Sequence, residues 1–437
     1  MSPRHAIVFA ALILCATRCA LYTDVTIQPL IVSPEKIERG ADIHSMLRKA
    51  DYLRAVGMAS SIEARQRPNA TDLLALGTAE LASARFDSAR KHLRTALDLS
   101  PDRQTYAEIA WALSQIEYLT NSYATSLEWA RLASQSGLTV LQWHLEYLEA
   151  MSSVPAYRFG GMPSDEIQLF IGRPDVPRVN VRINREGEPH SAVIDSGAVL
   201  SIMSERLAAT TSIRILPIGR GTFYGLLGEP ILVRFGLLDS LELGAVVVEN
   251  VPVAIMPDEK MRFVVRDRKE FHIDLLLGAN LLKEFRMELN FSRNRATFTR
   301  LTSRDRNPAP DQNLFFDNFR PHVRGTVNRH GWFLFVIDTG SEVTYLNEAQ
   351  MSRLPINSFA PRVHSATLQG LGGAKKRGAK IENVELGFDR WAGVFRTIPM
   401  YSAGEHDRSI GIIGQNFLQK FNVVMDFGTM RLNLSRR

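Results

Sequence analysis

Ala192-Val193-Ile194-Asp195-Ser196-Gly197 decides the fold of this chain, because its pattern returns as Phe335-Val336-Ile337-Asp338-Thr339-Gly340. Each copy is an apolar run followed by an aspartate, a hydroxyl residue and a glycine. Such a pattern predicts a buried strand that breaks into a tight turn and presents a carboxylate there. One copy would carry little weight. The second makes the two aspartates a pair.

A second motif follows each aspartate by about 80 residues. Leu276-Leu277-Gly278-Ala279-Asn280-Leu281-Leu282 corresponds to Ile412-Ile413-Gly414-Gln415-Asn416-Phe417-Leu418, and the correspondence continues beyond both segments. The same two motifs in the same order indicate an internal duplication. We therefore expect two β lobes of similar plan, each of which contributes one aspartate.

These four motifs resemble those of the aspartic proteases of the pepsin and retropepsin group, in a single-chain form with two retropepsin-like lobes. The resemblance covers roughly residues 170–437. It implies an all-β bilobal acid-protease fold, a polypeptide substrate and no cofactor. It also implies the site residues, which are Asp195 and Asp338 as the catalytic pair and Ser196, Gly197, Thr339 and Gly340 as support for their turns. Ser196 and Thr339 would lock the turns together by hydrogen bonds to the opposite lobe, and the two glycines would leave room for water and substrate.

The resemblance further places a flap, the mobile hairpin that closes over substrate, in a glycine-containing stretch of each lobe. Glycines there allow positive φ and close backbone approach. The flap residues expected to contact substrate are Tyr224, Gly225 and Gly228 in the first lobe and Gly370, Gly372 and Gly373 in the second.

Two carboxylates held a few ångströms apart cannot both ionise easily, so they retain one shared proton. One can then take a proton from water while the other gives one to the substrate carbonyl. The residue after each glycine differs, being Ala198 in one lobe and Ser341 in the other. A serine hydroxyl that donates to the pair would favour ionisation, and alanine withholds this help. The sequence therefore predicts a mildly acidic rather than strongly acidic optimum.

The N-terminal part of the chain has a different sequence pattern from the two lobes. Residues 1–20 have Arg4 and His5 before an apolar run, which is typical of a secretory signal peptide. Both cysteines, Cys15 and Cys19, lie in this leader, and either could accept a lipid after cleavage. We expect an extracytoplasmic protein, secreted or periplasmic. Membrane contact is expected only if the chain is lipidated or the leader stays uncleaved as an anchor.

Residues 21–41 are predicted to be an extended linker and residues 42–152 a helical region. Within Ala70–Pro101, small residues at Gly77, Ala89 and Ala96 fall at the spacings of a tetratricopeptide repeat, and a weaker copy follows one 34-residue period later. The fold class is therefore a multidomain chain with an all-α tetratricopeptide-like repeat before the β lobes. The repeats could bind a protein partner or could be a structural spacer, and the sequence leaves both open.

Strand patterns begin after Ser153. We place the first lobe at residues 153–303, a polar linker with two prolines at 304–311, and the second lobe at 312–437. The net charge of +6 comes without a basic run interleaved with aromatic residues, so no nucleic-acid partner is expected. The scattered histidines give no metal motif, and the glycines near Gly370 do not match a phosphate loop.

Three other interpretations remain. The duplicated aspartates could merely cap turns of a β fold. The lobes could form a catalytically silent module that binds peptides or proteins, with the repeats as a docking domain. The chain could also be a structural interaction protein of the cell surface. Two intact aspartates, each with its hydroxyl neighbour and glycine, favour the hydrolase.

Overall fold

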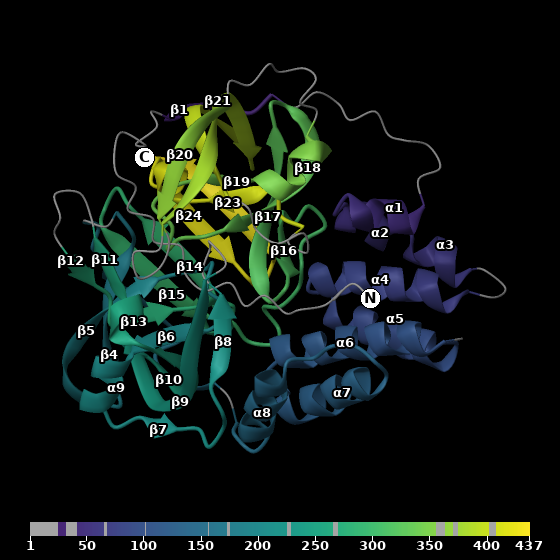
Figure 1. Ribbon diagram of the computed structural model, residues 1–437, viewed down its shortest axis with the longest axis horizontal. Coiled ribbons are helices and arrows are strands. Elements are labelled where there is room, and N and C mark those ends of the chain that lie inside the picture. The colour runs from purple at the N-terminus through teal and green to yellow at the C-terminus, as the bar shows by residue number, and fades with distance from the viewer. Residues whose placement is uncertain are drawn as a thin grey trace.

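A computed structural model describes residues 25–31, 42–64, 68–100, 102–155, 157–172, 175–224, 229–264, 270–354, 363–369, 375–401 and 408–437. It shows a helical N-terminal region beside a β-rich part made of two lobes (Figure 1). The predicted leader, at residues 1–20, lies outside the described residues. No helix in the described ranges is both long and apolar enough to cross a membrane.

The helical region consists of short helices followed by two long antiparallel pairs. Its helices are α1 (Ile43–Arg48), α2 (Tyr52–Gly57), α3 (Ala59–Glu63), α4 (Ala70–Ala82), α5 (Phe86–Asp98), α6 (Arg103–Leu119), α7 (Tyr123–Gln135) and α8 (Gln142–Met151). The side chains of Asn69 and Asp102 accept backbone N–H bonds at the starts of α4 and α6. A Cβ at Gly77 would lie 2.5 Å from Leu93 Cγ, so glycine lets α4 and α5 pack closely. The helices are as predicted, and their membership of the tetratricopeptide family stays a prediction.

The first lobe is a mixed sheet. Its strands, in spatial order, are β2 (Arg158–Gly161), β10 (Val246–Met256), β6 (Ser201–Ser204), β13 (Leu275–Leu277), β5 (Glu186–Ile194), β4 (Arg178–Ile183), β9 (Pro230–Leu243) and β7 (Arg214–Ile215), and β8 (Gly221–Tyr224) also pairs with β9. The short helix α9 (Glu205–Thr210) follows β6.

The second lobe repeats this plan. In spatial order its strands are β1 (Val25–Pro29), β22 (Trp391–Tyr401), β19 (Tyr345–Asn347), β23 (Gly411–Ile413), β18 (His330–Ile337), β17 (Arg320–Val327), β21 (Lys375–Phe388) and β20 (Val363–Gln369), and β16 (Leu314–Asp317) also pairs with β17. β13 runs parallel to β5, and β23 runs parallel to β18 in the same way. These apolar strands are buried on both faces, which explains their unbroken hydrophobic runs.

A third sheet joins the lobes. Its order is β25 (Arg431–Arg436), β24 (Phe421–Asp426), β14 (Phe285–Asn290), β15 (Arg295–Arg300) and β3 (Ser164–Gln168), and β14 of the first lobe pairs directly with β24 of the second. One apolar core runs from the helical region through both lobes. The two duplicated halves are therefore tied by backbone hydrogen bonds as well as by side-chain packing.

The prediction of a linker at residues 21–41 is wrong for residues 25–29. Residues 25–29 form β1, which pairs with β22 so that Pro29 faces Trp391 and Val25 faces Phe395. In the first lobe, β2 pairs with β10 in the equivalent register, with Gly161 opposite Val246. The N-terminal strand thus fills in lobe two the position that β2 fills in lobe one.

Candidate active site

The two aspartates stand at equivalent points of the two lobes. Asp195 follows β5, and its N–H donates to Leu277 O at 3.0 Å. Asp338 follows β18, and its N–H donates to Ile413 O at 3.1 Å. In each lobe, the strand that ends in the second motif thereby fixes the backbone of the aspartate. The exposed fraction of Asp195 is 0% and that of Asp338 is 1%.

The structure brings the two carboxyl groups together. A Cβ at Gly340 would lie 2.5 Å from Asp195 Cγ, and a Cβ at Gly197 would overlap the carboxyl group of Asp338. Each glycine therefore makes space for the aspartate of the other lobe. This is the arrangement in which two carboxylates can share one proton.

Ser196 and Thr339 join the turns by reciprocal hydrogen bonds between the lobes. Ser196 N–H donates to Thr339 Oγ1 at 3.0 Å, and Thr339 N–H donates to Ser196 Oγ at 3.1 Å. The two hydroxyls in turn donate to backbone carbonyls across the interface, Ser196 Oγ to Ile337 O at 2.6 Å and Thr339 Oγ1 to Ile194 O at 2.7 Å. All these groups are buried, so the network fixes the two turns relative to each other.

The hydrogen bonds to the two carboxylates are unequal. Asp195 Oδ1 accepts the N–H groups of Gly197 at 2.9 Å and Ala198 at 3.1 Å, whereas the Gly340 N–H donates to Asp338 Oδ1 at 2.9 Å. Burial raises the pKa of Asp195 to about 6, against the opposing effect of its hydrogen-bond donors. Burial and then the negative charge of Asp195 raise the pKa of Asp338 well above its usual range. The remaining proton therefore resides on Asp338, and Asp195 is the member that ionises first.

The Ser341 hydroxyl does not play the part expected from sequence. It donates to Val343 O at 2.9 Å, so its single proton is not directed at the carboxyl pair. The difference between Ala198 and Ser341 thus does not set the pKa values. The backbone N–H groups and the burial of the pair do.

Sequence reasoning missed two hydroxyl residues that hold the second motif of each lobe against the first. Asn280 Oδ1 accepts the N–H and Oγ of Ser201, at 2.7 and 3.0 Å. Asn416 Oδ1 accepts the N–H and Oγ1 of Thr344, at 2.9 and 2.7 Å. Ser201 and Thr344 each lie six residues after their aspartate, a repeated spacing that could have identified them.

The predicted flap residues are described only in part. Tyr224 ends β8 and is 37% exposed. Gly225, Gly228, Gly370, Gly372 and Gly373 lie outside the described residues. Within the described ranges no group of three or more histidine, cysteine, aspartate or glutamate side chains could hold a metal ion.

Comparisons with known proteins agree with this reading of the first lobe. A sequence model of the family described as gag-polyprotein putative aspartyl protease matches residues 179–284, which include Asp195 and the second motif. No curated protein matches the chain.

Solved structures that resemble the chain include three that we name. The aspartic proteinase from Irpex lacteus is 10% identical, with 62% of this chain and 97% of that one covered and a TM-score of 0.38. Basic 7S globulin from soybean is 13% identical, with 62% and 94% covered and a TM-score of 0.35. A retropepsin-like aspartic protease from Rickettsia conorii is 16% identical, with 32% and 93% covered and a TM-score of 0.22.

Proposed function

We propose that this protein is an aspartic endopeptidase, which hydrolyses peptide bonds with a water molecule activated between Asp195 and Asp338. The observation that carries the proposal is the buried pair itself, in which two aspartates of different lobes face each other and reciprocal hydrogen bonds hold their turns in register. A duplicated β fold whose aspartates only cap turns would not need each glycine to accommodate the opposite carboxyl group.

The unequal hydrogen bonding of the pair supports different roles for the two aspartates. Asp195, which ionises first, is the general base that removes a proton from the attacking water. Asp338, which retains the proton, donates it to the substrate carbonyl oxygen. Attack forms a tetrahedral gem-diol that is neutral, because each proton lost by one group is gained by another. In the collapse, Asp195 gives its proton to the leaving nitrogen and Asp338 takes one back from a gem-diol hydroxyl as the C–N bond breaks, so the pair returns to its starting state.

The substrate would be an extended polypeptide that lies between the lobes and pairs with the protein as an added strand. Because both carboxyl groups are buried, the chain around them must open before a peptide reaches the pair. Tyr224, which is partly exposed at the end of β8, is the described residue that we expect to contact the substrate. We further propose that the protein acts outside the cytoplasm, since residues 1–20 have the pattern of a signal peptide.

The test is to incubate the chain without its leader with a diverse peptide mixture at several pH values, with and without pepstatin. An Asp195→Asn variant is treated in parallel, and new peptide ends are identified by mass spectrometry. We expect cleavage by the wild type that pepstatin and the substitution both abolish. Cleavage that survives in the variant would contradict the proposal. A folded wild type that cleaves nothing under any condition would favour the silent binding module instead.

A further inference from the structure

The helical region is packed against lobe two through aromatic side chains. Tyr52 of α2 lies 5.5 Å from Phe315 of β16, and Phe86 of α5 stacks on Phe316 at 6.5 Å, measured between ring centroids. Gln312 Nε2 also donates to Ser83 O at 3.2 Å. These contacts are buried, so the α2–α5 segment forms part of the core rather than a tethered module.

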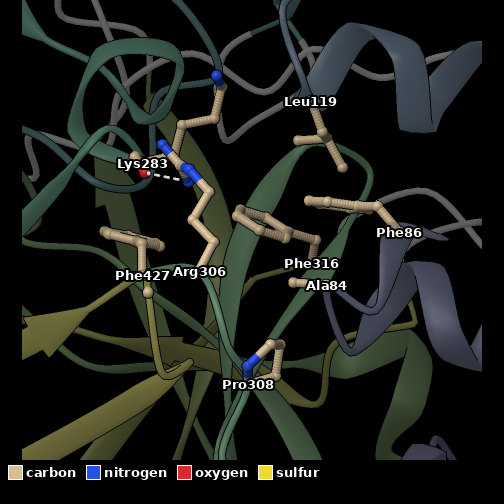
Figure 2. A pocket seen from close by; sticks show the side chains of 9 residues that line it. Ala84, Phe86, Leu119, Lys283, Arg306, Pro308, Phe316 and Phe427 are labelled. Carbon is tan, nitrogen blue, oxygen red and sulfur yellow. Dashed lines mark hydrogen bonds between the residues drawn. The ribbon is translucent and has the colours of Figure 1, made fainter. Parts of the chain in front are cut away.

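A second contact lies where the helices, lobe one and the interlobe linker meet. Asn121, between α6 and α7, accepts a hydrogen bond from Lys283 Nζ at 2.6 Å and donates to Glu284 Oε1 at 2.8 Å. Arg306 Nη2 of the linker donates to Glu284 Oε2 at 2.5 Å. Figure 2 shows the small pocket beside this junction, where Lys283 and Arg306 lie next to Phe316 and Phe427. Buried charges that are paired in this way strongly resist separation of the parts that carry them.

The third contact is between α8 and the β8–β9 hairpin of lobe one. The Trp143 ring stacks on Phe235 of β9 at 5.5 Å with an interplanar angle of 19°, and lies 5.7 Å from Phe223 of β8. A Cβ at Gly221 would lie 3.2 Å from Trp143 Cδ2 and 2.6 Å from Phe235 Cζ. Glycine at the first position of β8 therefore allows the strand to approach the tryptophan.

The same face of α8 also holds the backbone that enters β8. Glu146, one helical turn after Trp143, accepts the Gly219 N–H on Oε2 at 3.1 Å. A charged acceptor makes this a stronger bond than one between neutral groups. In the described residues, β8 pairs with β9 and with no other strand, and α8 packs against this four-residue strand from the helical region (Figure 1).

The pleat of β8 connects these contacts to the proposed site. Side chains alternate along a strand, so Phe223, buried against Trp143, and Tyr224, partly exposed, point to opposite faces. A shift of Phe223 away from α8 would therefore displace Tyr224 as well.

We propose that Trp143 and Glu146 are positioning residues that fix β8, and with it Tyr224, so that the helical region is a permanent working part of the catalytic unit. The proposal rests on the proposed function for the contact of Tyr224 with substrate. On this proposal, the helical region does not have to be removed for the enzyme to become active.

The experiment compares the full-length chain without its leader with Trp143→Leu and Glu146→Ala variants. Trp129→Leu is the matched control for the first, because Trp129 packs among the helices. Glu149→Ala is the control for the second, because Glu149 lies on the same helix with its side chain 63% exposed. Hydrogen exchange of the β8 amides is measured together with kcat, KM and the unfolding temperature.

We expect exchange in β8 to become about tenfold faster in both test variants, the effect of losing one contact of this strength. KM should rise and kcat/KM fall, while both controls resemble the wild type. Exchange that is unchanged in Glu146→Ala would overturn the proposal even if Trp143→Leu fails to fold. Faster exchange with unchanged kcat/KM would overturn the positioning role. If the wild type cleaves no peptide, the proposed function fails, and the exchange comparison alone still decides whether α8 anchors β8.

Discussion

Replacing Thr339 with valine should separate the two lobes' active-site turns without changing the shape of the side chain. The Thr339 hydroxyl accepts the Ser196 N–H at 3.0 Å and donates to Ile194 O at 2.7 Å, and all three residues are buried. Valine would leave this N–H and this carbonyl without their partner. Each unsatisfied buried group costs about 1–3 kcal/mol, so Thr339→Val should lower the free energy of unfolding by roughly 2–6 kcal/mol.

The assay is urea denaturation followed by fluorescence, with the free energy extrapolated to water. Thr339→Ser keeps the hydroxyl and should recover most of the loss. Thr211→Val is the control for removing a threonine hydroxyl elsewhere, since its Oγ1 donates to Leu207 O on the first lobe's surface helix. Ser196→Ala in the Thr339→Val background should cost less than it does alone, because both hydroxyls belong to one network. A Thr339→Val variant within about 0.5 kcal/mol of the wild type, the usual range for surface changes, would show that these hydrogen bonds do not stabilise the two turns.

Three further predictions concern the carboxyl pair. Activity should fall on the acid side as Asp195 becomes protonated near its raised pKa of about 6, and a pH–rate profile that peaks below about 3 would contradict this. Because the pKa of Asp195 is raised in the folded protein, this residue gives the fold a stabilisation that is complete below about pH 4, the pKa of an aspartate in the unfolded chain. That stabilisation is lost as the pH rises through about 6. Between pH 4 and 7, the free energy of unfolding of Asp195→Asn should therefore rise by about 3 kcal/mol relative to that of the wild type, as measured by denaturation curves. A difference between the two proteins that does not change with pH would contradict this prediction. Gly340→Ala should abolish activity and lower the unfolding temperature, because its Cβ would lie 2.5 Å from Asp195 Cγ, and wild-type rates would show that the pair is placed differently.

The sequence predicted the features that depend on short, repeated motifs. The duplication, the strands before Asp195 and Asp338, and the helices of the N-terminal region all appear in the structure. Local periodicity carries such information, because each motif contains its own strand, turn and glycine.

Features that depend on contacts between distant residues could not be predicted. The strand at Val25–Pro29 pairs with residues more than 300 positions away, and only the register of β2 on β10 shows why it belongs there. The pKa order of the pair depends on which backbone N–H groups reach Asp195, and the identity of Ala198 and Ser341 did not reveal it. The packing of α8 on Phe235 could not be predicted either, because the local sequence around Trp143 does not show which distant residue its ring contacts.

The proposed mechanism is tested most directly by peptide cleavage, compared between the wild type, Asp195→Asn, Asp338→Asn and the double variant at one pH near 6. Because the two carboxyl groups perform two halves of one proton transfer, each single substitution should abolish about as much activity as both together. We predict equal losses in all three variants, of at least about a hundredfold. If either single variant cleaves peptides at the wild-type rate, the two aspartates do not act as a pair and the proposed mechanism is wrong.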